Sequence, residues 1–227
     1  MKKLLLLVLL FSQNIFCQFL DKKEDLKKYE GYFNFYYDAK TDEIYLEVDK
    51  LDSLFLYNHA LRSGVGSNDI GLDRGQLGGA SVVKFQRAGD KLLLVEPNQK
   101  YRAVTDNELE KQSIEEAFAK SVIYGFEIKE EKDDKLIIDL TPFIMEDAHG
   151  VAERLKRGNY GSYKVSKNKS ALQLDRTKAF PKNVEFESLL TFEGSPQSGT
   201  VRSVVPDAAN ISVIQHYSFV ELPDDKY

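Results

Sequence analysis

Apolar residues recur at every second position in many short segments of this chain, a period typical of β-strands that are buried on one face. Residues 43–48, which read EIYLEV, are an example. Residues 81–96 predict a hairpin, because two such segments flank the turn sequence AGD at 88–90. The other predicted strands are residues 32–37, 53–60, 99–104, 123–129, 135–140, 184–192, 200–205 and 211–222. This pattern constrains the chain to a sheet-rich fold.

Two segments depart from this period and predict helices. Residues 107–120 carry apolar residues at helical spacing and follow a capping sequence at 105–108. Residues 147–157 indicate a short amphipathic helix. Strands and helices do not alternate regularly, which argues against a doubly wound fold. We therefore expect an α+β fold that is predominantly antiparallel β, either sandwich-like or built on one strongly curved sheet.

The first residues have the parts of an export signal. Lys2 and Lys3 precede an apolar run at 4–11 that is too short to span a bilayer, and a polar break follows. We expect residues 1–17 to be a signal peptide and residues 18–227 to form one β-rich domain without a transmembrane segment. The expected location is periplasmic, cell-surface or extracellular. The alternative is that the apolar run forms a buried first helix or strand.

Cys17 is the single cysteine of the chain, so the mature domain would have no internal disulfide to stabilise it. It is either a lipid attachment site or an ordinary residue at the cleavage point, and the bulky Phe16 before it favours the second. Removing residues 1–17 leaves 29 basic and 36 acidic side chains. This acidic balance makes nucleic acid and anionic membranes poor partners.

Residues 62–79 contain six glycines and little apolar material, and they predict a long loop. The spacing of Gly64, Gly66 and the later glycines matches no phosphate-binding motif. Arg62 and Arg74 bracket this segment, so the loop has the charge to bind an anion or the carboxylate of a partner. We expect Arg62, Gly64, Gly66 and Arg74 to form an interaction site. The alternative is an extended, mobile loop without a ligand.

The chain lacks the motifs of the common catalytic sites. Its three histidines, His59, His149 and His216, are far apart, and none begins the HExxH motif of zinc peptidases. No GxSxG motif occurs, and no pair of carboxylates has the spacing of an EF-hand calcium loop. We therefore expect no catalytic residue, no cofactor and no metal ligand. The alternative is that the three histidines converge in space.

A family resemblance rests on three segments: IDLTPF at 138–143, AFPKNVEFESLLTF at 179–192 and HYSFVELPDDKY at 216–227. They resemble the non-catalytic N-terminal domain of large secreted bacterial zinc-dependent metalloproteases of the metzincin-like type. This domain of unknown function is expected to act as a folding scaffold, a propeptide-like cover or a docking surface for the catalytic domain. The zinc ligands lie in that catalytic domain, so the resemblance assigns no catalytic residue here.

The resemblance implies a non-catalytic accessory domain of a secreted zinc metalloprotease system, whose partner is a metalloprotease catalytic domain. Since no HExxH segment follows residue 227, we expect a truncated or split product. A second hypothesis is a free-standing exported binding module that uses the loop at 62–79. A third is an enzyme whose site is assembled from residues distant in the sequence.

Overall fold

The computed structural model describes residues 19–224, so the predicted signal peptide at 1–17 and residues 225–227 lie outside it. Within that range the chain forms thirteen strands and four α-helices. The strands are β1 (Leu26–Tyr29), β2 (Asn34–Asp38), β3 (Glu43–Val48), β4 (Phe55–Ser63), β5 (Gln76–Ala88), β6 (Lys91–Glu96), β7 (Ser121–Lys132), β8 (Lys135–Asp139), β9 (Gly161–Val165), β10 (Ala171–Leu172), β11 (Lys178–Phe180), β12 (Asn183–Pro196) and β13 (Asn210–Glu221). The helices are α1 (Glu108–Ala117), α2 (Thr141–Ile144), α3 (Val151–Arg157) and α4 (Gly199–Val204), with short 3-10 helices η1 (Leu20–Lys22) and η2 (Lys167–Lys169).

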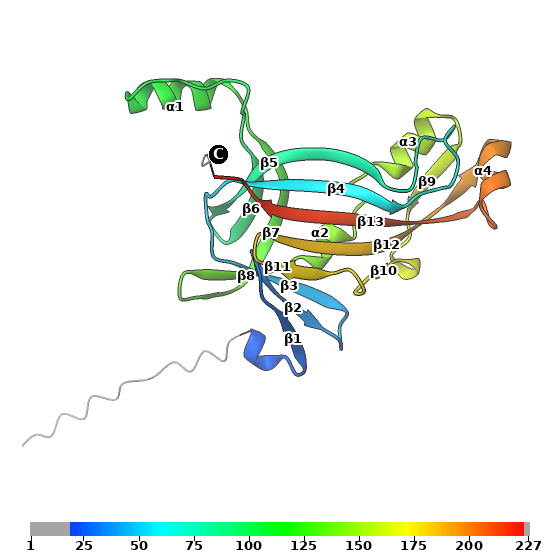
Figure 1. The fold of residues 1–227 in the computed structure, drawn as a ribbon, viewed down its shortest axis with the longest axis horizontal. Helices are drawn as coiled ribbons and strands as arrows, with labels where there is room; N and C mark the ends of the chain where they lie inside the picture. Colours follow the sequence, from blue (N-terminus) through cyan, green and yellow to red (C-terminus); the bar gives the residue numbers. More distant parts are fainter. Residues whose placement is uncertain (1–18, 225–227) are drawn as a thin grey trace, which may run out of the picture.

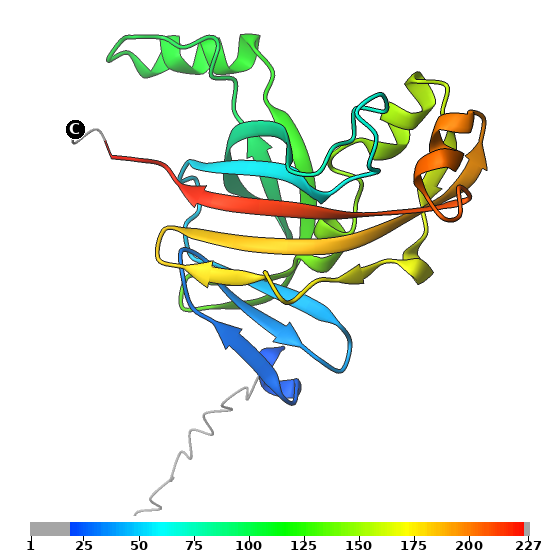
Figure 2. The same cartoon turned by 45° about the vertical axis from the view of Figure 1, so that its right-hand side comes forward.

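The strands of residues 19–224 form one antiparallel sheet in the order β1-β2-β3-β8-β7-β6-β5-β4-β13-β12-β10, and β9 and β11 also pair with β12. The sheet is strongly curved (Figures 1 and 2). Its two ends meet where the backbone N–H of Tyr32 donates to the carbonyl of Phe180 at 2.8 Å. Gly31 permits this approach, since a Cβ there would lie 2.6 Å from the same carbonyl oxygen. Of the two arrangements expected from the sequence, the structure has the curved sheet.

The larger hydrophobic core fills the concave side of this sheet and is rich in aromatic rings. Phe143 of α2 lies within it, with its ring centroid 5.3 Å from Tyr124 on β7 and 5.7 Å from Tyr57 on β4. Phe35 on β2 lies 5.1 Å from Phe186 on β12, although these strands are far apart in the sheet order. The curvature therefore packs the two ends of the sheet against each other.

A second core lies at the end of the long strands that carries α3 and α4 (Figure 1). It buries apolar side chains from strands, from both helices and from the connection between β4 and β5. These residues are Leu61, Val65, Ile70, Leu72, Val151, Leu155, Tyr163, Leu190, Phe192, Val201, Ile211 and Val213. The β4–β5 connection is thus part of the packed structure.

The predicted α+β fold with mainly antiparallel strands is confirmed. Residues 43–48 and 91–96 coincide with β3 and β6, and Gly89 turns the predicted hairpin with a φ of 64°. The predicted strand at 99–104 is wrong. The side chain of Asn98 accepts hydrogen bonds from two successive backbone N–H groups after it, which turns the chain out of the sheet.

The predicted strand at 200–205 is also wrong, because residues 200–204 belong to α4 and Val205 is the residue that ends it. Val204 and Val205 follow Val201 by three and four residues, which is helical spacing, while Val201 and Val205 also fit the period of a strand. Val201 is buried in the second core, and the partly buried Val204 and Val205 pack against this core. Tertiary packing therefore overrides the strand preference of valine here.

Both predicted helices are present, and both begin later than expected. The side chain of Asn107 caps α1 by accepting the backbone N–H of Leu109 at 3.0 Å, as the sequence at 105–108 indicates. Asp147 lies before α3 and accepts the backbone N–H groups of Val151 and Ala152, each at 2.8 Å. The predicted start of this helix is therefore its capping residue. No helix between residues 19 and 224 is long and apolar enough to cross a lipid bilayer.

Candidate functional site

Arg62 on β4 lies on the convex face of the sheet, where it contacts a buried carboxylate. Its Nε is 2.9 Å from Oε2 of Glu187 on β12, and the Glu187 side chain is 1% exposed. The two atoms form no hydrogen bond with each other, so the contact is an ion pair without hydrogen-bond geometry. A weaker ion pair joins Arg62 to Asp175 at 3.8 Å. Arg62 thus helps to compensate the buried charge of Glu187.

His216 on β13 lies beside this pair and contacts two carboxylates. Its Nδ1 is 3.1 Å from Oε1 of Glu187, and its Nε2 is 2.6 Å from Oε2 of Glu185. The hydrogen bond to Glu185 raises the pKa of His216, although burial opposes it. Burial acts to raise the pKa of Glu185, but hydrogen bonds from His216, Ser218 and Asn183 outweigh it and lower that pKa. Both shifts favour an ion pair between the imidazolium and the carboxylate.

We call Arg62, Glu185, Glu187, His216 and Ser218 the outer cluster. The hydroxyl of Ser218 lies 3.3 Å from Nε2 of His216. A serine and a histidine at this distance resemble the nucleophile and general base of a hydrolase. Glu185, however, accepts hydrogen bonds from both groups. A protonated imidazole has no lone pair for the serine proton. The outer cluster therefore ties β4, β12 and β13 together and does not activate this serine.

The predicted loop at 62–79 is shorter and more closely packed than expected. Arg62 belongs to β4 and residues 76–79 belong to β5, so the connection spans residues 64–75. It buries Val65, Ile70 and Leu72 in the second core. The backbone N–H of Val65 also donates to the carbonyl of Leu72 at 2.9 Å. The expectation of an extended, mobile loop overlooked these three apolar residues among the glycines.

The other residues predicted for the interaction site have separate local roles. A Cβ on Gly64 would lie 2.1 Å from the carbonyl oxygen of Leu72, so this position needs glycine for close packing. Gly66 has a φ of 89° in open space. Arg74 is exposed and makes no ion pair within residues 19–224. The structure does not assemble these residues with Arg62 into a pocket, and their role in binding stays a prediction.

The concave side of β4 brings together two of the three histidines. The rings of His59 and His149 are perpendicular, with centroids 5.4 Å apart. Nε2 of His59 accepts the backbone N–H of Gly79 at 3.2 Å, and Nε2 of His149 lies 3.2 Å from Oε1 of Gln76. Burial lowers the pKa of His59, and it lowers the pKa of His149 to about 4, so both rings are neutral at neutral pH.

His216 lies in the outer cluster, on the other face of the sheet, so the three histidines do not converge as the alternative reading required. Between residues 19 and 224, no three side chains of His, Cys, Asp or Glu are placed to hold a metal ion together. The chain separation of His59 and His149 explains why no motif predicted their contact.

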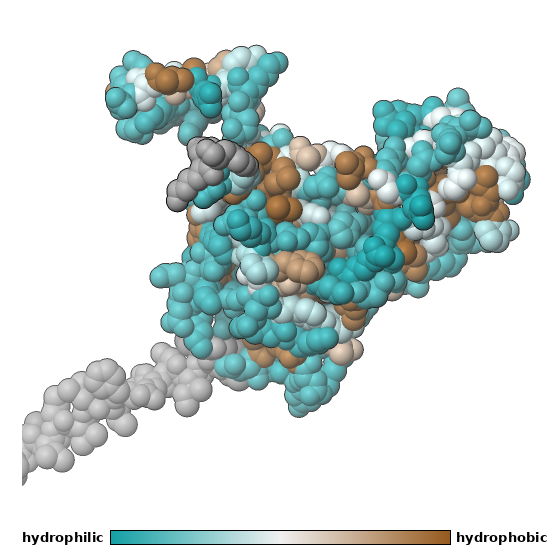
Figure 3. Space-filling model, in the orientation of Figure 1, coloured by the Kyte–Doolittle hydropathy of each residue, from teal (hydrophilic) through white to brown (hydrophobic). Residues whose placement is uncertain are grey.

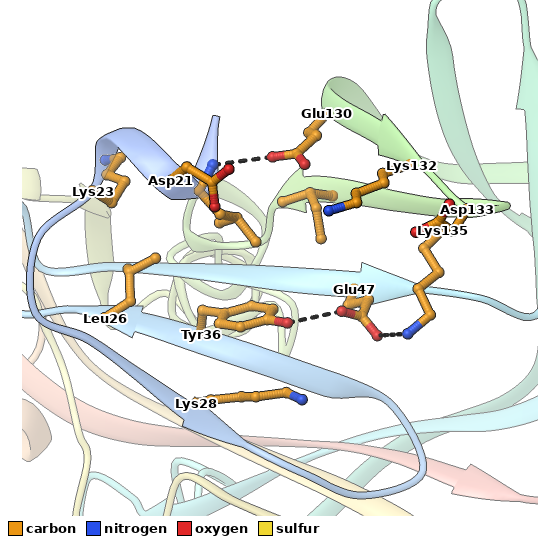
Figure 4. Close-up of a pocket in the computed structure, with 12 residues that line it drawn as sticks. Asp21, Lys23, Leu26, Lys28, Tyr36, Glu47, Glu130, Lys132, Asp133 and Lys135 are labelled. Carbon is orange, nitrogen blue, oxygen red and sulfur yellow. Dashed lines mark hydrogen bonds and ion pairs between the residues drawn. The ribbon is translucent and has the colours of Figure 1, made fainter. Parts of the chain in front are cut away.

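A cleft of about 610 Å³ opens on the outer side of β1, β2, β3, β7 and β8, below the 3-10 helix η1 (Figure 4). Lysines and carboxylates line it in equal number, together with Tyr36 and three aliphatic side chains. Glu47 accepts hydrogen bonds from the Tyr36 hydroxyl at 2.8 Å and from Nζ of Lys135 at 2.7 Å (Figure 4). Because its charges balance, the cleft has no evident preference for anions or cations.

Residues 97–120 form an arm that projects from the sheet between β6 and β7 (Figures 1 and 2). The arm contains α1, which buries none of its residues. Tyr101 and Phe118 stack within it, with ring centroids 3.9 Å apart. Val104 is 92% exposed and Leu109 is 75% exposed, and apolar surface is visible on the arm in Figure 3. The arm thus carries apolar side chains that the sheet does not cover.

Residues 75–227 match the family DUF5117, described as a domain of unknown function. The chain belongs to the DUF5117 family. The comparisons with curated proteins and with solved structures found no match. The family description states no activity, so it supports the domain of unknown function that the sequence indicated and leaves the link to metalloproteases as a proposal.

The DUF5117 match extends over the arm, α3 and the strands β5 to β13. It therefore includes His149 and all the members of the outer cluster on β12 and β13, which are Glu185, Glu187, His216 and Ser218. Arg62 and His59, which lie on β4, are outside the match. Sequence reasoning identified α1 as a helix and missed that it stands away from the sheet. The signal for this was the polarity of residues 105–120, which contain too few apolar residues to bury a helix face.

Proposed function

We propose that this DUF5117 chain is an exported, non-catalytic accessory domain of a zinc metalloprotease system and that it docks on the catalytic domain through its arm. The observation that carries the proposal is an α-helix of ten residues with no buried residue. Isolated helices of this length are marginally stable in water. Packing against a second domain would stabilise α1 and cover its apolar side chains.

The surface chemistry of the arm supports protein docking. Val104 and Leu109 are the kind of exposed apolar residues that mark interaction sites when they gather in one element. The stacked pair of Tyr101 and Phe118 adds a rigid aromatic surface, and aromatic residues are enriched in protein interfaces. The identity of the partner rests on the resemblance of residues 138–143, 179–192 and 216–227 to the N-terminal domain of secreted zinc metalloproteases.

The experiment is association, measured by surface plasmon resonance, between the whole chain and a separately produced zinc peptidase domain of the resembled type. The double variant Val104→Asp/Leu109→Glu should weaken binding by at least about tenfold. Leu77→Glu is the matched control, since Leu77 is also 75% exposed but lies on β5, outside the arm. Failure of the unmodified chain to associate, or an equal loss with Leu77→Glu, would contradict the proposal.

The alternative of a free-standing binding module that uses the glycine-rich loop has less support. Arg62 already forms an ion pair with Glu187, so its charge is not free for a ligand. Three apolar residues of the connection 64–75 are buried in the second core. Deleting this connection would therefore disturb folding, so Arg74→Glu is the better probe of this alternative.

A further inference from the structure

We propose that Asp38, Glu43 and Tyr45 form a recognition site for a primary ammonium group, and that Lys23 of the N-terminal segment 19–25 occupies this site as a removable strap. The inference is independent of the arm and of the proposed docking partner. It assigns the site to a lysine side chain, which a lysine of a partner protein can replace when the strap leaves.

The site satisfies all three N–H donors of one ammonium group. Nζ of Lys23 lies 2.9 Å from Oδ2 of Asp38, 3.3 Å from Oε2 of Glu43 and 2.6 Å from the hydroxyl of Tyr45. A lysine ammonium has three donors and no acceptor, so this arrangement matches it fully. The guanidinium of arginine is planar and larger, and it does not suit three acceptors converging on one nitrogen.

Two aromatic rings complete the site. Nζ of Lys23 lies 4.7 Å from the ring centroid of Tyr45 and 5.3 Å from that of Phe19. Cations within about 6 Å of a ring centroid are attracted by the ring quadrupole. Phe19 also contacts Tyr45 edge-on at 5.0 Å, so the strap supplies one ring of the site and β3 supplies the other.

The three acceptors of the site belong to β2 and β3, and the strap covers them. Asp38 ends β2 and is 2% exposed, and its other oxygen accepts the backbone N–H of Lys40 at 2.9 Å. Glu43 and Tyr45 belong to β3. With the strap in place the carboxylate of Asp38 is covered, so pairing with an ammonium group offsets its loss of hydration. The site therefore favours occupation by some cation.

The strap itself has few attachments. Beyond Lys23 and Phe19, the backbone N–H of Leu20 donates to Oε2 of Glu130 at 3.0 Å (Figure 4), and Glu24 forms an exposed ion pair with Lys40. The strap joins β1 at Asp25, whose φ of 61° is a left-handed conformation that aspartate adopts more readily than most residues other than glycine. Segments with few buried contacts open at low cost in free energy. Leu20, Asp21 and Lys23 of the strap line the cleft of about 610 Å³, so release of the strap would remove one of its walls.

Chemical rescue tests the site in the full-length mature chain. Lys23→Ala removes the part of the side chain that n-propylammonium replaces, and it should lower the midpoint of thermal unfolding. Adding n-propylammonium chloride should raise that midpoint in Lys23→Ala and leave the unmodified chain unchanged. Two compounds serve as controls: 1-propanol has no charge, and tetramethylammonium has no N–H donor.

Lys22→Ala is the matched control variant, because Lys22 is exposed and adjacent in sequence. It should leave the midpoint unchanged with and without n-propylammonium. The double variant Lys23→Ala/Asp38→Asn should not be rescued. Rescue of Lys23→Ala by tetramethylammonium to the same extent, or no rescue at all of a folded Lys23→Ala protein, would overturn the proposal.

Limited proteolysis gives a second measurement that keeps the lysine in place. Asp38→Asn weakens the site, so trypsin should cleave after Lys22 and Lys23 several-fold faster than in the unmodified chain. Cleavage elsewhere in the sheet should be unchanged. Equal rates of strap cleavage in Asp38→Asn and the unmodified chain would refute a strap held by this site.

Discussion

Nε2 of His216 lies 2.6 Å from Oε2 of Glu185 on the neighbouring strand, and the other ring nitrogen faces the buried Glu187. Arg62 reaches the same carboxylate from β4. Two cations and two carboxylates from three strands thus form a compact network on the convex face of the sheet. The charge of His216 depends on pH, so the contribution of this network to stability should also depend on pH.

The folded-state pKa of His216 is raised above its ordinary value of 6.5. Its stabilisation is therefore complete below about pH 6.5 and is lost as the pH rises through the raised folded-state pKa. The pKa of Glu185 is lowered from 4.5, so its contribution is present above that value and is lost as the pH falls through the lowered one. Stability from this pair should be greatest between about pH 4.5 and pH 6.5, where both contributions are complete.

His216→Gln should lower the free energy of unfolding by about 2 kcal/mol in mildly acidic buffer, and by less in alkaline buffer. Urea denaturation as a function of pH measures the difference. His149→Gln should show the opposite trend, because the folded-state pKa of His149 is about 4 and only the unfolded chain binds the proton below about pH 6.5. Removing this ring should therefore help stability most in mildly acidic buffer. A pH-independent cost of His216→Gln would show that the imidazole is not charged in the folded protein.

Arg62→Met should destabilise the protein because it leaves Glu187 buried with only His216 as a partner. We expect a loss of about 2 kcal/mol, reduced from the cost at a fully buried pair because Arg62 is partly exposed. The double variant Arg62→Met/Glu187→Gln should cost less than the sum of the two single variants. Arg74→Met, on an exposed arginine, should change stability by less than about 0.5 kcal/mol. Strict additivity of the two changes would contradict an energetic coupling of the ion pair.

Gly78→Ala should destabilise the protein, since a Cβ at this position would lie 2.1 Å from two atoms of the His59 ring. The expected cost is about 2 kcal/mol, as for other overpacked positions. Gly79→Ala provides the control, because its Cβ would lie 3.7 Å from Nε2 of His59, an ordinary contact distance. Chemical denaturation measures both. His59→Ala should relieve only part of the cost of Gly78→Ala, because the carbonyl oxygen of His59, 2.8 Å from the same Cβ, stays in place. An undiminished cost in the double variant would exclude the ring as a cause.

The arm should be dispensable for the stability of the sheet. Val104→Asp/Leu109→Glu should change the free energy of unfolding by less than about 0.5 kcal/mol, because both side chains are exposed. Phe143→Ala in the larger core, by comparison, should cost about 4 kcal/mol. Thermal and urea unfolding distinguish the two. A large loss of stability in the arm variant would show that these residues pack within the chain, and it would remove the basis for docking through the arm.

The local sequence was sufficient for most of the secondary structure. The alternation in residues 43–48 specifies a strand whatever its neighbours are, and the turn sequence at 88–90 places a hairpin with few alternatives. Asn107 specifies the start of α1, because its side chain bonds a backbone group only two residues away. Where the signals conflicted, as for the valines of 200–205, burial in the second core decided in favour of a helix.

The candidate sites depended on the tertiary structure. Arg62 is 125 residues from Glu187 in the chain, and His59 is 90 residues from His149, so no spacing could predict either contact. Lys23 meets Asp38 and Glu43 only because β2 and β3 form a hairpin and the segment before β1 folds back over them. In a regular strand such as β13 the sequence by itself determined which side chains face the core, because side chains alternate between the two faces. Register shifts between β4 and β13 and between β6 and β7 interrupt this alternation. The order of the strands and the curvature of the sheet decided which polar side chains meet, because those depend on contacts between segments far apart in the chain.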